Sequence, residues 1–364
     1  MASHLHRIET SVPDPCYEQE WTAELMTKHV GGRRGVGRII RSIYRNSGIE
    51  TRHSVIDDWS EGAEPLFFRG DELLPTPGTE ARNALYTREA RIHFERLARQ
   101  LLDGSPGIGP EDVTHLVTIS CTGFYAPGPG YQVVRALGLP ESVERYHIGF
   151  MGCFAAFQGL RMADAFCRAD PDAVVLVLSV ELCTLHLRFT PETDDLIAGA
   201  VFADGGAGAL VTGHPPAGRG LELGAFHTAL APEGEEDMAW TIGNEGFRMK
   251  LSSYVPEILE GALEPALERL LDRAGLDAGE VPWWAVHPGG RQILDRVSDQ
   301  MSLRPEQLAA SREVLRRYGN MSSATVLFVL AELLKGELVP GDPVLAMAFG
   351  PGLTIEAGVL TVTG

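Results

Sequence analysis

Hydrophobic and polar positions along the chain follow two patterns. Short apolar runs bounded by glycine, proline or acidic residues are typical of strands buried on both faces. Two longer segments begin with small residues and continue as apolar stretches, which predicts buried helices. The runs are THLVTISCTG, PDAVVLVLSVEL, FADGGAGALVTG, PWWAVHPGG, PGDPVLAMAFG and PGLTIEAGVLTVTG, and the helical segments are GCFAAFQGLRMADAF and GNMSSATVLFVLAELL. Together they predict an α/β protein.

The order of these elements repeats. A helix beginning near Cys153 is followed by two strands, and so is a helix beginning near Asn320. Each half also has a strand that ends in a chemically interesting residue, Cys121 in the first half and His287 in the second. We interpret the chain as two related halves, residues 1–213 and 214–364. A pseudo-twofold duplication would bring Cys153, Asn320 and His287 to one central crevice, the usual place for an α/β active site.

Cys153 is the candidate nucleophile. We expect it in the first turn of its helix, where unpaired N–H groups and the helix dipole favour the thiolate and lower the thiol pKa from about 8.5. Each of these three residues also has a plainer interpretation. Free cysteines are often simply buried, His287 could pair with a core carbonyl, and Asn320 could cap a turn.

Four motifs in this order resemble one known family: GCFAA around Cys153, HPGG at His287, GNMSSA at 319–324 and FGPGLTIE at 349–356. They resemble type III polyketide synthases of the chalcone synthase superfamily, over nearly the whole chain. The resemblance implies a thiolase fold with five alternating layers, αβαβα, working as a homodimer. HPGG, GNMSSA and FGPGLT favour this branch over the β-ketoacyl-acyl carrier protein synthases III, and the set is similar to bacterial alkylpyrone and alkylresorcinol synthases.

The resemblance also implies a reaction. Cys153, activated by an ion pair with His287, would take the acyl group of an acyl-CoA starter as a thioester. His287 and Asn320 would hold the thioester oxygen while malonyl-CoA loses CO₂. Claisen condensation and cyclisation would then give a pyrone or a phenolic, resorcinol-type ring, with CoA thioesters as substrates and neither cofactor nor metal. Two alternatives remain: a single-round ketosynthase or acyltransferase served by a carrier protein, and an idle thiolase-fold protein that binds acyl-CoA.

Other residues match the family's cavity and its CoA site. Phe202 occupies the position of a gatekeeper phenylalanine, whereas Met249 stands where plant enzymes have a second one. The expected cavity-lining set also includes Cys121, Cys183, Trp240 and Ser322, with Trp240 narrowing the elongation cavity. For CoA, the resemblance implies phosphate contacts by Arg45 and Arg52, and close approach of the pantetheine arm to the backbone at Gly289 and Gly290.

Composition limits the classes of partner and the cellular location that we expect for this protein. A net charge of −18 disfavours nucleic acid, which requires a basic footprint. Apolar runs are too short for the ~20 residues of a membrane span, and the N-terminus has no signal-peptide pattern. Five cysteines without metal-ligand spacing are typical of reduced thiols, so we expect a cytoplasmic protein.

Overall fold

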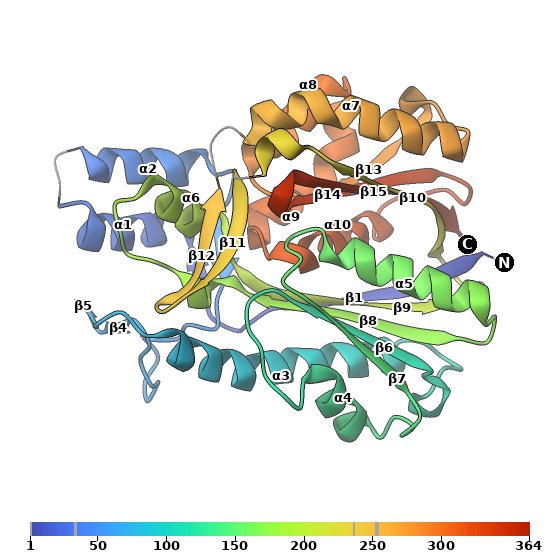
Figure 1. Ribbon diagram of the computed structural model, residues 1–364, viewed down its shortest axis with the longest axis horizontal. Coiled ribbons are helices and arrows are strands. Elements are labelled where there is room, and N and C mark those ends of the chain that lie inside the picture. The colour runs from blue at the N-terminus through green and yellow to red at the C-terminus, as the bar shows by residue number, and fades with distance from the viewer. Residues whose placement is uncertain (1, 33–34, 236, 252–254) are drawn as a thin grey trace.

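The computed structural model describes residues 2–32, 35–235, 237–251 and 255–364. Nine strands are joined by hydrogen bonds into one continuous sheet. The sheet bends so that its two parts lie on either side of the central helices (Figure 1). The strand order is β13 (Trp283–Val286), β14 (Pro343–Gly350), β15 (Thr354–Thr363), β10 (Gly220–Leu230), β1 (Ser3–Ser11), β9 (Asp204–Thr212), β8 (Val174–Leu182), β6 (His115–Ser120) and β7 (Glu144–Gly149). All six strands predicted from apolar runs are present.

The same pairing pattern occurs twice. In the first half β6 is parallel to β8, which pairs antiparallel with β9, and β9 pairs antiparallel with β1. In the second half β13 is parallel to β14, which pairs antiparallel with β15, and β15 pairs antiparallel with β10. Antiparallel pairing of β1 with β10 joins the two sheets. The internal repeat predicted from the sequence is therefore present, and the proposed division at 213/214 falls between β9 and β10.

Helices complete five layers. α5 (Ala155–Ala169) and α10 (Thr325–Leu334) lie between the two sheets, α3 (Thr79–Asp103) and α4 (Pro129–Leu137) cover one outer face, and α7 (Val255–Ala274) and α8 (Arg291–Gln300) cover the other (Figure 1). α10 consists of the almost wholly apolar sequence TVLFVLAELL, as a helix enclosed on all sides requires. The layers follow the predicted order αβαβα.

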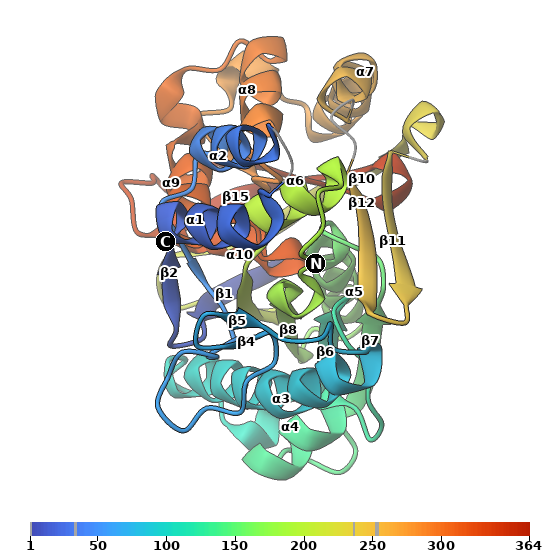
Figure 2. The ribbon, with the colours of Figure 1, turned by 90° about the vertical axis from the view of Figure 1, so that its left-hand side faces the viewer.

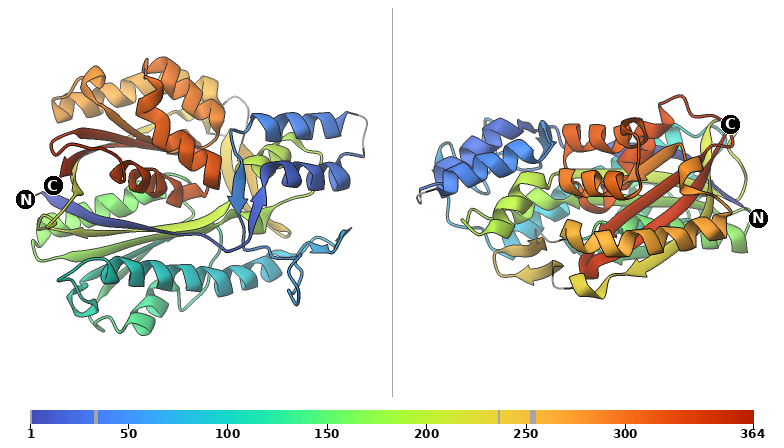
Figure 3. Two further views of the ribbon diagram at one scale, coloured as in Figure 1. Left: turned by 180° about the vertical axis from the view of Figure 1, so that it is seen from behind. Right: turned by 90° about the horizontal axis from the view of Figure 1, so that it is seen from above.

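The remaining elements gather at the end of the molecule opposite the two termini (Figures 2 and 3). They are α1 (Gln19–Val30), α2 (Val36–Asn46), α6 (Thr193–Val201), the hairpin of β11 (Met238–Gly243) and β12 (Gly246–Leu251), and the short pairs β2 (Cys16–Glu18) with β3 (Thr51–His53) and β4 (Phe68–Arg69) with β5 (Glu72–Leu73). α9 (Ala309–Tyr318) packs against α10 and β3. Among the described helices, none is long and apolar enough to cross a membrane.

Candidate active site

A cavity of about 370 Å³ lies between the two halves of the chain, toward the end of the molecule opposite the termini. Its size falls within the range typical of small-molecule sites. Cys153, His287 and Asn320 all line it, although they come from three distant segments. So do the other residues predicted for the cavity and for the pantetheine arm: Phe202, Cys121, Cys183, Trp240, Met249, Ser322, Gly289 and Gly290.

Cys153 lies in the turn between β7 and α5, just before the helix instead of in its first turn as predicted, because α5 begins at Ala155 after the N-cap residue Phe154. Gly152 makes this turn possible with a φ of 88°, a value that favours glycine. A Cβ on Gly152 would lie 2.2 Å from Cδ of Pro351. The FGPG motif of the second half therefore packs directly on the turn that presents Cys153.

His287 follows the last residue of β13. Its backbone N–H donates to the carbonyl of Met347 over 2.8 Å, which continues the pairing of β13 with β14 past the strand end. Both ring nitrogens are buried without a hydrogen-bond partner among the described residues. The plainer interpretation, in which the ring pairs with a core carbonyl, does not apply. A buried imidazole with two open nitrogens beside a cavity is available to a bound molecule.

Asn320 is held by its backbone and by its side chain. It forms an isolated parallel bridge with Phe202: its N–H donates to Val201 O over 2.8 Å, and its carbonyl accepts from the N–H of Ala203 over 2.9 Å. In the side chain, Oδ1 accepts from the N–H of Ser322 and Nδ2 donates to the carbonyl of Gly289. These contacts fix the amide orientation and direct the second N–H of Nδ2 toward the cavity, where the Cys153 sulfur is within reach.

Burial governs the charges in this site. It raises the pKa of the Cys153 thiol to about 12, against the smaller lowering effects of hydrogen bonding to Ser322 and Asn320. It also lowers the pKa of His287 to about 3. The dry cavity disfavours each charge taken separately, and the thiolate–imidazolium pair expected from the sequence stays a prediction. Proton transfer from the thiol to the imidazole would create two opposite charges together, whose attraction offsets part of that cost.

Glu181 is a buried carboxylate near the site that the sequence analysis missed. Its Oε2 accepts hydrogen bonds of 2.9 Å from the N–H of Cys121 and from Oγ1 of Thr122, and Oε1 accepts from Oγ of Ser323. Burial raises the pKa of Glu181, and its charge is one of the influences that raise the Cys153 pKa. The available signal was a single acidic residue inside the apolar run VVLVLSVEL.

His186 is a second missed residue on the cavity wall. Its ring stacks on Phe247 at 4.2 Å between centroids, Nε2 pairs with the carbonyl of Thr122, and Nδ1 accepts from the N–H of Phe247. Since Nδ1 accepts, Nε2 carries the proton. The ring is therefore neutral, as expected from burial, which lowers its pKa to about 3.

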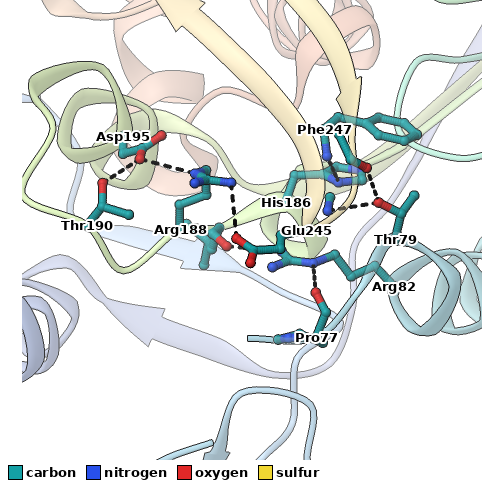
Figure 4. Close-up of polar contacts among 12 residues, drawn as sticks. Pro77, Thr79, Arg82, His186, Arg188, Thr190, Asp195, Glu245 and Phe247 are labelled. Atoms are coloured by element: carbon teal, nitrogen blue, oxygen red, sulfur yellow. Dashed lines mark hydrogen bonds and ion pairs between the residues drawn. The ribbon is translucent and has the colours of Figure 1, made fainter. Parts of the chain in front are cut away.

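The β11–β12 hairpin adjoins His186 and continues the same cavity wall, since His186 packs on Phe247 of β12 and on Trp240 of β11. Trp240 and Met249 are cross-strand partners on it, and the Trp240 indole N–H donates to Cys121 O over 2.8 Å. At the other end of the hairpin, the turn is tied to the rest of the molecule by Thr79 and by Arg188, which lies between Asp195 and Glu245 (Figure 4). The wall that carries Trp240 is thus anchored at both ends.

Arg82 supports the segment that carries Cys183 and His186. Its side chain is buried and donates to the backbone carbonyl of Pro77 (Figure 4). It also donates to the carbonyls of Leu185 and Leu187. These bonds hold the short 3₁₀ turn Cys183–His186 against α3.

The structure corrects the expectation for Arg52. Its side chain is 5% exposed, and it donates to Oε1 of Gln19 and to the carbonyl of Phe202 inside the protein, so it does not reach a CoA phosphate in solvent. Arg45 lies on the exposed face of α2 and does not line the cavity, although Ser42 of the same helix does. A phosphate contact by Arg45 remains a prediction.

The described part of the chain contains no cluster of three or more histidine, cysteine or acidic side chains placed to hold a metal ion. All five cysteines are free thiols.

Sequence comparisons agree with this geometry. The chain matches the models of the N-terminal domain of chalcone and stilbene synthases over residues 5–216 and of the C-terminal domain over residues 222–363. It is 31% identical over 354 residues to 1,3,6,8-tetrahydroxynaphthalene synthase of Streptomyces coelicolor, covering 97% of this chain and 90% of that protein. It is 31% identical over 325 residues to the alpha-pyrone synthesis polyketide synthase-like Pks18 of Mycobacterium tuberculosis, covering 87% and 80%. It also matches the probable polyketide synthase 1 of Dictyostelium discoideum at 28% identity, but spans only 11% of that protein.

Solved structures give the same result. PKS-I from the brown alga Ectocarpus siliculosus superimposes with a TM-score of 0.90 at 30% identity, covering 99% of this chain and 98% of that one. Tetrahydroxynaphthalene synthase of S. coelicolor superimposes with a TM-score of 0.88 at 30% identity, covering 99% of both chains. The thiolase fold predicted from the sequence is confirmed. With both domain models matched and the cysteine, histidine and asparagine on one cavity, the chain belongs to the chalcone and stilbene synthase family and is a type III polyketide synthase.

Proposed function

We propose that this protein loads an acyl-CoA starter on Cys153, extends it with malonyl-CoA and cyclises the product to a pyrone or a phenolic ring. The observation that carries the proposal is the meeting of Cys153, Asn320 and an imidazole with two open nitrogens, His287, on one cavity. In the loading step the thiol proton passes to His287, sulfur attacks the starter carbonyl, and the CoA thiolate leaves and takes up the proton.

The extension step uses His287 and Asn320 as hydrogen-bond donors. When malonyl-CoA loses CO₂, negative charge develops on its thioester oxygen. The His287 ring and the second Nδ2 proton of Asn320 are suited to donate hydrogen bonds to that oxygen. The resulting enolate carbon attacks the Cys153 thioester, and the cysteine is released as the chain moves to CoA. Phe202, Met249 and Trp240 then limit the space in which the chain folds and cyclises.

We infer that the active form is a homodimer. β7 is the outer strand of its sheet, and Phe124, Tyr131 and Met151 near it are 39–46% exposed. Open strand edges and exposed apolar side chains favour association. Light scattering after size-exclusion chromatography measures the mass in solution, and the mass of a monomer would contradict the dimer.

The location follows from the thiols. Free thiols, including the proposed nucleophile Cys153, favour a reducing compartment such as the cytoplasm.

The decisive experiment incubates the purified protein with malonyl-CoA and a series of acyl-CoA starters, and identifies the products by mass spectrometry. Ring products that grow by two-carbon units without a carrier protein support the proposal. If no CoA starter gives product while Cys153 still reacts with iodoacetamide, a carrier-dependent, single-round ketosynthase becomes the better explanation.

A further inference from the structure

A cluster of basic side chains surrounds His227 of β10, outside the active-site cavity. His227 lies past the end of the pairing between β10 and β1, where β10 continues to pair with β15 after a register shift. Nη1 of Arg273 donates to the carbonyl of Phe226, the preceding residue, over 3.2 Å. Nη2 of Arg161 donates to Oγ1 of Thr228, the following residue, over 2.8 Å. None of these five residues lines the cavity.

The positive charge of this cluster is only partly balanced. Arg161 pairs with the buried carboxylate of Glu356 over 2.8 Å. Arg269 and Arg273 are exposed, and among the described residues neither has a carboxylate within ion-pair distance. They lie four residues apart on α7, a spacing at which like charges on a helix repel each other. In a chain with a net charge of −18, this pair of adjacent cations favours binding of an anion.

The His227 ring lies among these arginines. Burial and the charges of the three arginines lower the pKa of the ring, so the ring is neutral near pH 7. Its Nε2 is buried without a hydrogen-bond partner among the described residues. An oxyanion between the two flexible guanidinium groups of α7 would provide a partner for Nε2 and would offset the repulsion between Arg269 and Arg273.

From this geometry we propose that His227, Arg269 and Arg273 form a binding site for a phosphate group, either as the free ion or as the ester of a small molecule. Guanidinium groups present parallel N–H donors that match the oxygens of phosphate, and the neutral imidazole adds one more donor. The site is separate from the cavity and from the CoA-phosphate contact predicted at Arg45. The inference therefore goes beyond the proposed function and does not depend on it.

Nuclear magnetic resonance of protein labelled with carbon-13 at histidine Cε1 measures binding at this site directly. The His227 signal, assigned by its absence from His227→Gln, should move and saturate as inorganic phosphate is added. We expect Arg269→Gln/Arg273→Gln to raise the phosphate concentration at half-saturation at least tenfold, because both charge-assisted donors are lost. Arg96→Gln/Arg99→Gln is the matched control, since it removes two charges from exposed positions on α3.

A His227 signal that ignores phosphate in the wild type, or that responds equally in the wild type and in Arg269→Gln/Arg273→Gln, would overturn the inference. Arg269→Gln alone, with an expected loss of at least threefold, covers the case in which the double variant does not fold. Titration with glycerol 3-phosphate distinguishes an esterified ligand from the free ion, and tighter binding of either supports the site. If the wild type ignores phosphate while the double variant has a lower oligomeric mass, the cluster is a protein interface and the inference is wrong.

Discussion

The Arg52 guanidinium donates a hydrogen bond of 2.6 Å from Nη1 to the carbonyl oxygen of Phe202, a residue 150 positions later in the chain. Phe202 is the bridge partner of Asn320, and Nε of Arg52 is held by Gln19 over 2.9 Å. One buried cation thus fixes the backbone at Phe202 and, through the bridge, at Asn320.

We expect Arg52→Lys to lower the free energy of unfolding by about 1–3 kcal/mol, because a lysine cannot make both bonds and leaves a buried acceptor unpaired. Urea denaturation measures this. Arg45→Lys, on the exposed face of α2, is the control and should change stability by less than about 0.5 kcal/mol. Unchanged stability with a raised KM for CoA substrates would instead support the phosphate contact first expected from the sequence.

Cys153→Ala should abolish starter loading and polyketide formation but keep part of the malonyl-CoA decarboxylation, since His287 and Asn320 remain in place. Release of CO₂ from labelled malonyl-CoA and mass spectrometry of products measure the two activities. Cys167→Ala is the control because Cys167 is buried in α5 and does not line the cavity. Continued polyketide synthesis by Cys153→Ala would remove this residue from its assigned role.

Asn320→Ala should reduce malonyl-CoA decarboxylation by about 10²–10³-fold, the usual loss on removing one oxyanion donor. Acylation of Cys153 by a starter should suffer less, and rapid-quench labelling can follow it separately. The oxyanion role would be wrong if acylation fell first while decarboxylation survived.

Trp240→Ala should enlarge the elongation cavity and shift the products toward longer or differently folded chains. The loss of the bond from Trp240 to the Cys121 carbonyl also frees the wall to move. Ile242→Ala on the same strand is the control, because Ile242 is 56% exposed and does not line the cavity. Identical product profiles for Trp240→Ala and the wild type would place Trp240 outside the determinants of product size.

The stability of the protein should decrease as the pH falls from about 6.5 toward 4. His93 is buried beside Ser11, and burial lowers its pKa from 6.5 to about 4. The unfolded chain therefore binds a proton in this window that the folded chain does not, so acid favours unfolding.

His93→Gln should flatten this pH dependence by up to about 1.4 kcal/mol per pH unit, the contribution of one proton. Urea denaturation at several pH values measures the slope. The control is His214→Gln, at a histidine whose side chain is 69% exposed. An unaltered slope in His93→Gln would show that folding does not lower the pKa of His93.

Much of the fold could be predicted from local patterns. The apolar runs ending at Leu182 and at Gly350 are both strands, and the repeat of helix, strand and strand indicated the duplication before any contact was known. That repeat indicated Cys153 and Asn320 as corresponding residues of the two halves. The position of HPGG at a strand end indicated His287. Periodicity and glycine position are local properties, so a single segment is enough to reveal them.

Charge states and partners of buried groups could not be predicted in the same way. Arg52 looks like a phosphate ligand in sequence because arginines surround it, yet it is buried against Gln19 and Phe202. Glu181 looks like an irregularity in a strand, yet it is bound by Thr122 and Ser323. In both cases the deciding contacts come from residues far away in the chain.

The sequence by itself determined the layered α/β fold, its internal repeat and the three residues of the candidate site, because each depends on short-range patterns or recognisable motifs. Only the tertiary structure decided that burial raises the pKa of Cys153 and lowers that of His287, and that Arg52 holds the backbone at Phe202. The physical reason is burial, since desolvation, hydrogen-bond partners and empty space arise only when distant segments pack together.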